Sequence, residues 1–196
     1  MNRKNVLDND RLKSHYEELN LIHQEFSKAF KKQFDRSIPL NEELLDRWER
    51  AKQLEFGENT SIYDSAFVFG NPSVGKDVWI GPYTIIDSTG GLTIGDNVTV
   101  SVGVQIYTHD NVKKTLLGND APIEYDKVSI GRNTYIGPNA VISRGVTIGA
   151  FCIIATNSFV NRSFPDNAII AGSPAKQIGE TVIENDNVEL KYFKTT

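Results

Sequence analysis

Residues 128–160 read VSIGRN TYIGPN AVISRG VTIGAF CIIATN SFV, and every sixth position from Ile130 onward holds Ile or Val. The same register extends towards the N-terminus with two interruptions. Its repeating positions are Ile62, Val68, Val74, Ile80, Ile86, Ile94, Val100, Ile106, Ile130, Ile136, Ile142, Ile148, Ile154 and Val160. Glycine follows six of these fourteen residues, whereas an average glycine usage of about 7% would give roughly one. The chain therefore contains a hexapeptide repeat.

A repeat of this length predicts a parallel β-helix, because helical repeats need about 30 residues or more. Ile and Val favour a pleated, half-buried surface, so each repeating residue should point inward from a short strand. The glycines indicate tight corners. Smaller interior side chains recur four positions later, at Ala66, Thr84, Val98, Val104, Thr134, Ala140, Val146, Cys152 and Ser158. The alternative, a β-sandwich, would space its turn signals about 8–12 residues apart.

The composition narrows the class of protein. The chain has 196 residues, a net charge of −4 and one cysteine. The length suffices for a sizeable core, and the lack of a basic block argues against nucleic acid as the main partner. With no apolar stretch near 18 residues and no signal-peptide pattern, we expect a cytoplasmic protein without membrane insertion. Cys152 has no partner for an internal disulfide and fits a small buried position.

The first 57 residues follow a helical period instead. Apolar residues spaced by three and four predict an amphipathic helix: Leu12, Tyr16, Leu19, Ile22, Phe26, Phe30 and Phe34. Pro39 ends this run, and Asn41 can cap a second helix that extends to about Gly57. Because an uncapped β-helix exposes core and strand edges, we expect these helices to form a cap. The predicted domains are a helical segment over 1–57, a β-helix over 58–179 and a C-terminal tail over 180–196.

The two interruptions of the repeat are candidate functional loops. Two extra residues enter between Ile86 and Ile94, within the stretch Asp87-Ser88-Thr89-Gly90-Gly91. A longer insertion, residues 110–127, lies between Ile106 and Ile130 and lacks the repeat. Loops that leave a rigid scaffold often carry binding or catalytic groups.

The repeat, the motif Tyr107-Thr108-His109-Asp110 and the return at Val128-Ser129-Ile130-Gly131 resemble the left-handed β-helix acyltransferases. The likeness covers roughly residues 58–179 and is strongest to the sugar O-acetyltransferases. That branch includes the maltose and galactoside acetyltransferases and the enzymes that modify capsule or O-antigen. The resemblance implies a left-handed coil, a homotrimer and acetyl-CoA as co-substrate.

The resemblance also implies that His109 is the general base. Transfer of acetyl from a thioester to a hydroxyl needs a base for the O–H, and a neutral imidazole titrates near the working pH. His109 is the only histidine in the repeat. His15 and His23 fall on the predicted N-terminal helix, where we expect structural roles.

Carboxylates near His109 are the candidate partners of the base or of the acceptor. If the repeat has three faces per turn, Ile106 stacks above Ile86, so that Tyr107 lies above Asp87. Asp87 is then a candidate to bind the acceptor's hydroxyls or to orient the imidazole, while Asp110 and Glu124 compete for the orienting role. We therefore predict a substrate-binding set of Asp87, Tyr107, Asp110 and Glu124.

The donor site is taken from the resemblance. In the family the pantetheine arm lies between adjacent subunits along the C-terminal coils, and the matching stretch here is Ala155, Thr156 and Asn157. The segment 171–176 resembles the family's Pro-containing exit, which implies that Lys176 lies near the CoA phosphates. Lys113 and Lys114 are further candidates to meet CoA or an anionic sugar. Tyr135 stands where related enzymes often have Trp, and we expect it to be structural.

We therefore expect an acetyl-CoA-dependent O-acetyltransferase whose acceptor is a sugar hydroxyl in a cell-surface polysaccharide or O-antigen precursor. N-acetylation of an amino or nucleotide sugar is the alternative, because the residues do not distinguish a hydroxyl from an amine. A non-catalytic trimeric scaffold is the third reading. A zinc enzyme on this fold would need three histidine ligands, so we predict no metal. A trimer is also expected because one flat solenoid face is shallow, whereas two paired faces form a cleft.

Overall fold

The structure, a computed structural model, describes residues 3–185 and 187–194. The chain divides into two compact units, Met1–Asp46 and Arg47–Thr196. None of the helices in the described residues combines the length and the apolar character needed to cross a membrane.

The first unit is helical. It contains a short 3-10 helix η1 (Arg3–Val6), the long helix α1 (Asp10–Phe34) and the short helix α2 (Leu40–Leu44). The Asn9 side chain accepts the backbone N–H groups of Arg11 and Leu12 and so caps α1. Glu43 of α2 is buried, where it accepts the Ser27 hydroxyl at 2.8 Å and lies 2.7 Å from His23 Nδ1. These contacts fold α2 back onto α1.

The expected single helix from Asn41 to Gly57 is wrong. It is divided into α2 and α3 (Arg47–Gln53), because Leu45 adopts an extended conformation with φ −107° and ψ 125°. The N-cap of α2 is Pro39 rather than Asn41, and no side chain caps it. The break coincides with the boundary between the two compact units, so the two short helices belong to different bodies.

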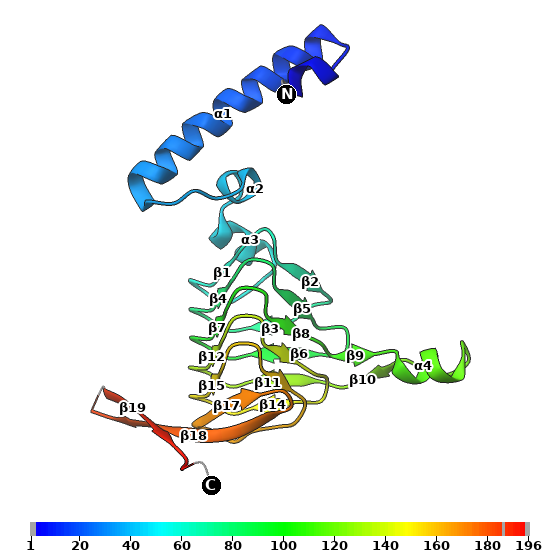
Figure 1. Cartoon of the computed structure of the whole chain (residues 1–196), viewed down its shortest axis with the longest axis vertical. Coiled ribbons are helices and arrows are strands. Elements are labelled where there is room, and N and C mark those ends of the chain that lie inside the picture. The colour runs from blue at the N-terminus through cyan, green and yellow to red at the C-terminus, as the bar shows by residue number, and fades with distance from the viewer. Residues whose placement is uncertain (1–2, 186, 195–196) are drawn as a thin grey trace. The chain divides into compact units, whose positions relative to one another are not determined.

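The second unit confirms the predicted parallel β-helix, whose three sheets run along the solenoid (Figure 1). Sheet A contains β1 (Ser61–Ile62), β4 (Trp79–Ile80), β7 (Thr99–Val100), β12 (Tyr135–Ile136), β15 (Ile153–Ile154), β17 (Ala168–Gly172), β18 (Ala175–Glu184) and β19 (Asn187–Tyr192). Sheet B contains β2 (Phe67–Phe69), β5 (Ile85–Asp87), β8 (Gln105–Ile106), β13 (Val141–Ile142) and β16 (Phe159–Val160). Sheet C contains β3 (Ser73–Val74), β6 (Leu92–Ile94), β11 (Val128–Ile130) and β14 (Thr147–Ile148).

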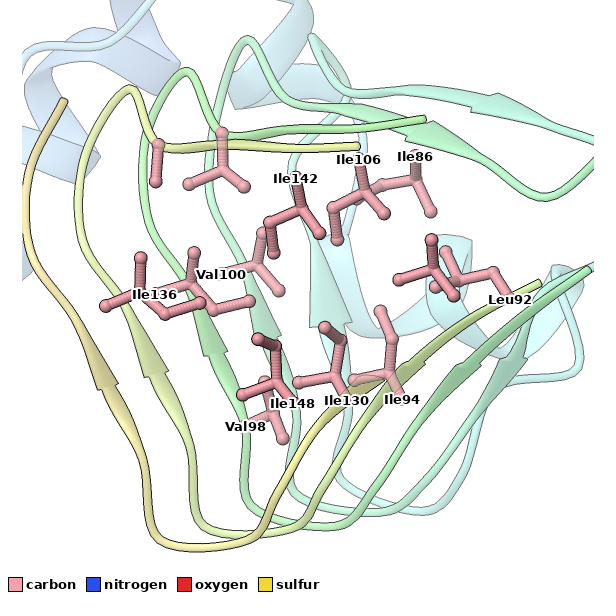
Figure 2. Close-up of a cluster of buried hydrophobic side chains, with 14 of the residues drawn as sticks. Ile86, Leu92, Ile94, Val98, Val100, Ile106, Ile130, Ile136, Ile142 and Ile148 are labelled. Atoms are coloured by element: carbon pink, nitrogen blue, oxygen red, sulfur yellow. The ribbon is translucent and has the colours of Figure 1, made fainter. Parts of the chain in front are cut away.

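The repeating Ile and Val residues form the core, as predicted, except that Val68 is only partly buried and packs against it. In sheet B, Ile86 pairs with Ile106 and Ile106 with Ile142, so residues at the same position of the repeat stack in successive coils. Figure 2 shows the labelled side chains converging inside the coil. At the open end, α3 lies against the first coil: Ala51 is buried, and Arg50 donates to the carbonyl oxygens of Tyr63 and Ala66.

The glycines that follow the inward residues are required by close approach between coils. A Cβ built on Gly137 would lie 2.7 Å from the backbone nitrogen of Thr156, and one on Gly131 would lie 2.4 Å from that of Ala150. Left-handed backbone occurs two residues later instead, for example at Asn133 and Asn139, both with φ 57°. The sequence predicts tight corners at these glycines, but the structure requires them for close packing between coils, and the turns lie two residues later.

Two appendages leave the solenoid. The long interruption forms β9 (His109–Asp110), α4 (Val112–Leu117) and β10 (Glu124–Tyr125), and Figure 1 shows α4 projecting from the coils. At the C-terminal end, β17 pairs in parallel with β15 and then reverses into antiparallel β18 and β19. Most of segment 180–196 thus lies in a β-hairpin that extends sheet A.

We predict that Gly137→Ala lowers the free energy of unfolding by about 1–3 kcal/mol or more, because the clashing atoms are backbone and cannot turn away. Urea unfolding followed by circular dichroism measures this. Ser143→Ala is the matched control, since Ser143 follows the inward residue Ile142 as Gly137 follows Ile136, and Ser143 already carries a Cβ. Equal losses for the two variants would contradict the close-approach explanation.

Candidate active site

His109 lies at the corner where the chain leaves sheet B and would enter sheet C, at the root of the long interruption. The shorter interruption, residues 87–91, leaves the solenoid at the same corner one coil below, because β5 stacks directly under β8. The two departures from the repeat are therefore adjacent in space. Gly90 allows this approach, since a Cβ there would lie 2.3 Å from the carbonyl oxygen of Thr108.

Asp87 holds the imidazole from below. Its Oδ2 atom lies 2.8 Å from His109 Nδ1, and the hydroxyl of Thr89 lies 2.9 Å from the same nitrogen. A carboxylate only accepts hydrogen bonds, so Nδ1 carries the proton and Nε2 presents its lone pair. The side chain of His109 is 38% exposed and lies against a carboxylate that is 1% exposed.

Asp87 itself is saturated by donors. Its Oδ1 atom accepts the backbone N–H and the hydroxyl of Thr89, at 3.0 and 2.7 Å. Its Oδ2 atom also accepts the backbone N–H and the hydroxyl of Thr108, at 2.8 and 3.0 Å. Burial acts to raise the pKa of Asp87, but the hydrogen bonds from Thr89, Thr108 and His109 outweigh it and hold that pKa well below the usual 3.8.

Asp110 and Glu124 face a different partner, Arg144. Arg144 follows β13 one coil above, and its Nε, Nη1 and Nη2 atoms reach Asp110, Asp126 and Glu124 respectively. Glu124 also accepts Lys113 Nζ at 2.6 Å. The hydrogen bond from Arg144, followed by that from the Val112 backbone, holds the pKa of Asp110 below its usual value. Of the three carboxylates that the sequence leaves open, only Asp87 contacts the imidazole.

The long interruption also places an aromatic ring beside the base. Strands β9 and β10 form an antiparallel ribbon in which Tyr125 pairs with His109 and Glu124 with Asp110. The rings of Tyr125 and His109 have centroids 5.7 Å apart and are tilted by 31°. Arg144 thus ties down the residues that flank both rings.

A cavity of about 430 Å³ opens beside His109. It is lined by Tyr107, His109, Asp110, Asn111, Ile123, Val141, Ser143 and Phe159. The Tyr107 hydroxyl donates to Gln105 at 2.7 Å, which fixes its ring in this wall. Three of the four predicted substrate-binding residues therefore meet at the cavity or directly beneath it. The fourth, Glu124, lies on the opposite strand of the ribbon and is bound to Arg144 and Lys113.

The predicted donor residues lie elsewhere in the same chain. Ala155, Thr156 and Asn157 form the turn from β15 to β16, at the corner between sheets A and B. The backbone of Ala155 bonds to Ile170 and that of Asn157 to Pro138. Lys176 is exposed on β18 opposite Ala171. A second cavity of about 410 Å³ is lined by residues of β12 and β15, among them Tyr135 and Ile153, and by Thr181, Ile183 and Val188 of the C-terminal hairpin.

Several site residues escape sequence reasoning. Thr89 and Arg144 were not singled out, although coil stacking places Arg144 above Thr108, and that register could have identified it. Tyr125 gives no such signal, because its place depends on how the interruption folds. Among residues 3–185 and 187–194, no three His, Cys, Asp or Glu side chains are grouped to hold a metal ion.

We predict that Asp87→Asn destabilises the protein near pH 7 and that the gap to wild type narrows below about pH 4. The pKa of Asp87 is lower in the folded state than in the unfolded state. Ionised Asp87 therefore stabilises the fold above about pH 4, and this stabilisation is lost as the pH falls from there towards the folded-state pKa. Urea unfolding between pH 3 and 8 measures both proteins. Asp77→Asn, at an exposed turn with φ 57°, is the control. A gap that stays constant over the whole range would contradict the prediction.

Comparison with known proteins places this chain in a family. Residues 127–162 match the family model described as bacterial transferase hexapeptide (six repeats), and residues 73–108 match the hexapeptide repeat of succinyl-transferase. The galactoside O-acetyltransferase of Escherichia coli is 29% identical over 83% of this chain and 79% of its own. An acetyltransferase-family protein of Dictyostelium discoideum is 30% identical over 72% of this chain and 77% of its own.

Solved structures share the fold. The hexapeptide-repeat acetyltransferase VCA0836 of Vibrio cholerae superimposes with a TM-score of 0.61 at 23% identity, covering 83% of this chain and 92% of its own. It has also been solved with acetyl-CoA, at 25% identity and a TM-score of 0.53. AntD, an N-acyltransferase of Bacillus cereus, matches with a TM-score of 0.58 at 21% identity, over 69% of this chain and 90% of its own. The solenoid is therefore a left-handed parallel β-helix, and the chain belongs to the hexapeptide-repeat acyltransferases.

Proposed function

We propose that this chain transfers an acetyl group from acetyl-CoA to a sugar hydroxyl, with His109 as the general base. The observation that carries the proposal is the Asp87–His109 pair at the edge of a cavity. The E. coli galactoside O-acetyltransferase, similar over most of its length, supports a sugar acceptor. The complex of the V. cholerae relative with acetyl-CoA supports the donor. The acceptor belongs to a cell-surface polysaccharide or its precursor, as the sequence resemblance implies.

The chemistry follows from the geometry. Nε2 of His109 takes the proton of the acceptor hydroxyl while its oxygen forms a bond to the thioester carbonyl carbon. The carbon–sulfur bond then breaks, and the CoA sulfur leaves and receives the proton from the imidazolium. Asp87 stabilises the imidazolium through Nδ1 and keeps the ring in one orientation. Because both oxygens of Asp87 are saturated, we assign it this supporting role rather than contact with the acceptor.

Transfer to an amino sugar is the second candidate. AntD, which shares the fold, is an N-acyltransferase. At 21% identity that likeness speaks for the fold alone, so the galactoside enzyme carries more weight. The same base and donor would serve either acceptor.

We propose a homotrimer with sites between subunits. Sheets A and B carry apolar residues on their outer surfaces, including Tyr135, Ile153 and Phe67. The outward residues of sheet C are Ser73, Thr93, Ser129 and Thr147, so the outer face of sheet C is polar and compatible with exposure to solvent. The donor turn at residues 155–157 and His109 also lie at different corners of one chain. A neighbouring subunit that packs against sheet B would bring such a turn to His109.

We predict that His109→Ala lowers kcat by about 10²–10⁴, because general-base catalysis contributes that much. Thiol release from acetyl-CoA with a panel of free, amino and nucleotide-linked sugars measures the rate. His15→Ala, in the first compact unit, is the matched control and should behave like wild type. Undiminished transfer by His109→Ala would rule out the base assignment. A wild-type chain that binds no CoA would favour the scaffold reading.

We predict that the wild-type chain sediments as a trimer in sedimentation velocity. Tyr135→Lys should convert the trimer to smaller species, because the lysine charge on the apolar outer face of sheet A would be buried without a partner. Ser129→Lys, on the outer face of sheet C, should leave the trimer intact. A stable wild-type monomer would exclude sites between subunits.

A further inference from the structure

The surroundings of His109 have a charge that bears on the class of acceptor. Four carboxylates, Asp87, Asp110, Glu124 and Asp126, lie in or against the ribbon that carries the base. The cations paired with them are Arg144 and Lys113, so these six groups together carry a net charge of −2; Lys114 and Lys127 belong to the same interruption but not to this set. None of the cavity-lining residues is Lys or Arg.

Carboxylates take up three of the five N–H groups of Arg144. Arginine recognises phosphate with two parallel N–H groups of its planar guanidinium. Here each of its three nitrogens donates to a different carboxylate, those of Asp110, Glu124 and Asp126. Lys113 donates to Glu124 at 2.6 Å. A phosphate arriving at the cavity would have to displace these partners and leave carboxylates unpaired beside it.

The walls of the cavity suit an uncharged ring. Tyr107, Ile123, Val141 and Phe159 provide apolar surface, while Ser143 and Asn111 provide neutral hydrogen-bonding groups. A pyranose has the same mixture of apolar ring faces and hydroxyls. The anionic surroundings would also favour the protonated form of an amine, which is not nucleophilic.

We propose that the acceptor is an uncharged glycoside, acetylated on a hydroxyl, and that the carboxylates around Arg144 select against sugar phosphates and nucleotide sugars. This rests on the proposed function and deepens it. Of the expected acceptors, it favours a sugar already built into a glycan over a nucleotide-linked precursor. Lys113 then holds the ribbon through Glu124 instead of meeting an anionic sugar.

The test compares acceptors that differ at the anomeric position alone. For galactose, glucose and N-acetylglucosamine, the methyl glycoside, the phenyl glycoside, the 1-phosphate and the UDP-sugar are each offered with acetyl-CoA. We expect kcat/KM for the methyl and phenyl glycosides to exceed that for the phosphate-bearing compounds by about tenfold or more. The phenyl glycoside controls for bulk. Comparable or higher values for the phosphate-bearing compounds would overturn the proposal.

A variant separates charge from shape. Asp126→Asn removes one negative charge at a residue that does not line the cavity and keeps an oxygen that can accept from Arg144, so the preference for the neutral glycoside should shrink by about threefold or more. Asp77→Asn makes the same change at an exposed turn of the first coil and should leave the preference unchanged. Raising the salt concentration to about 1 M, where the Debye length is about 3 Å, should also reduce the preference. A preference insensitive to both would indicate steric exclusion and overturn the electrostatic assignment.

Measuring the binding of the same compounds by saturation-transfer NMR distinguishes the proposed acetyl transfer from the proposed charge selection. Binding of the methyl glycoside over the 1-phosphate without acetyl transfer would support the charge selection and contradict the proposed reaction. Acetyl transfer to UDP-sugars in preference to glycosides would support the proposed acetyltransferase activity and overturn the proposed selection against phosphate-bearing acceptors. A chain that neither binds nor acetylates any of the compounds contradicts both.

Discussion

In-register stacking of one coil on the next is the constraint on which the rest of the molecule depends. The hydrogen bond from Gly137 N–H to the Ile154 carbonyl, 2.8 Å long, is typical of the rows that join successive coils. It brings the backbones so close that glycine is required at several positions. A residue that does not fit the period cannot be absorbed inside the coil and must leave at a corner. Both interruptions leave at the corner between sheets B and C, which is why Asp87, Thr89 and His109 meet there.

The site uses carboxylates in two different environments. Asp87 is buried under five donor groups from Thr89, Thr108 and His109, so it stays ionised and holds the imidazole in place. The carboxylates of the ribbon are more open and share one guanidinium, that of Arg144. The first arrangement fixes the tautomer of His109. The second ties a projecting segment to the rigid solenoid while leaving negative charge beside the cavity. Rigid support of this kind keeps a base in its productive geometry.

One chain supplies only part of the proposed reaction centre. His109 and its cavity lie at the corner after sheet B, whereas the turn expected to meet pantetheine lies at the corner before it. The apolar outer surfaces of sheets A and B and the Ser and Thr surface of sheet C agree with assembly through the first two. In the proposed reaction centre, the apolar faces are thus as necessary as His109.

The sequence by itself determined the solenoid, its inward residues and the place of His109 at the root of the long interruption, because a six-residue period fixes direction and stacking without reference to distant contacts. It also placed Asp87 beneath Tyr107 by counting coils. Tertiary structure alone decided that Asp87, rather than Asp110 or Glu124, contacts His109, and that Arg144 and Tyr125 frame the site. It also divided the helix expected at 41–57 and turned the tail into a hairpin. These features depend on segments outside the repeat, whose paths are set by long-range pairing that no local period encodes.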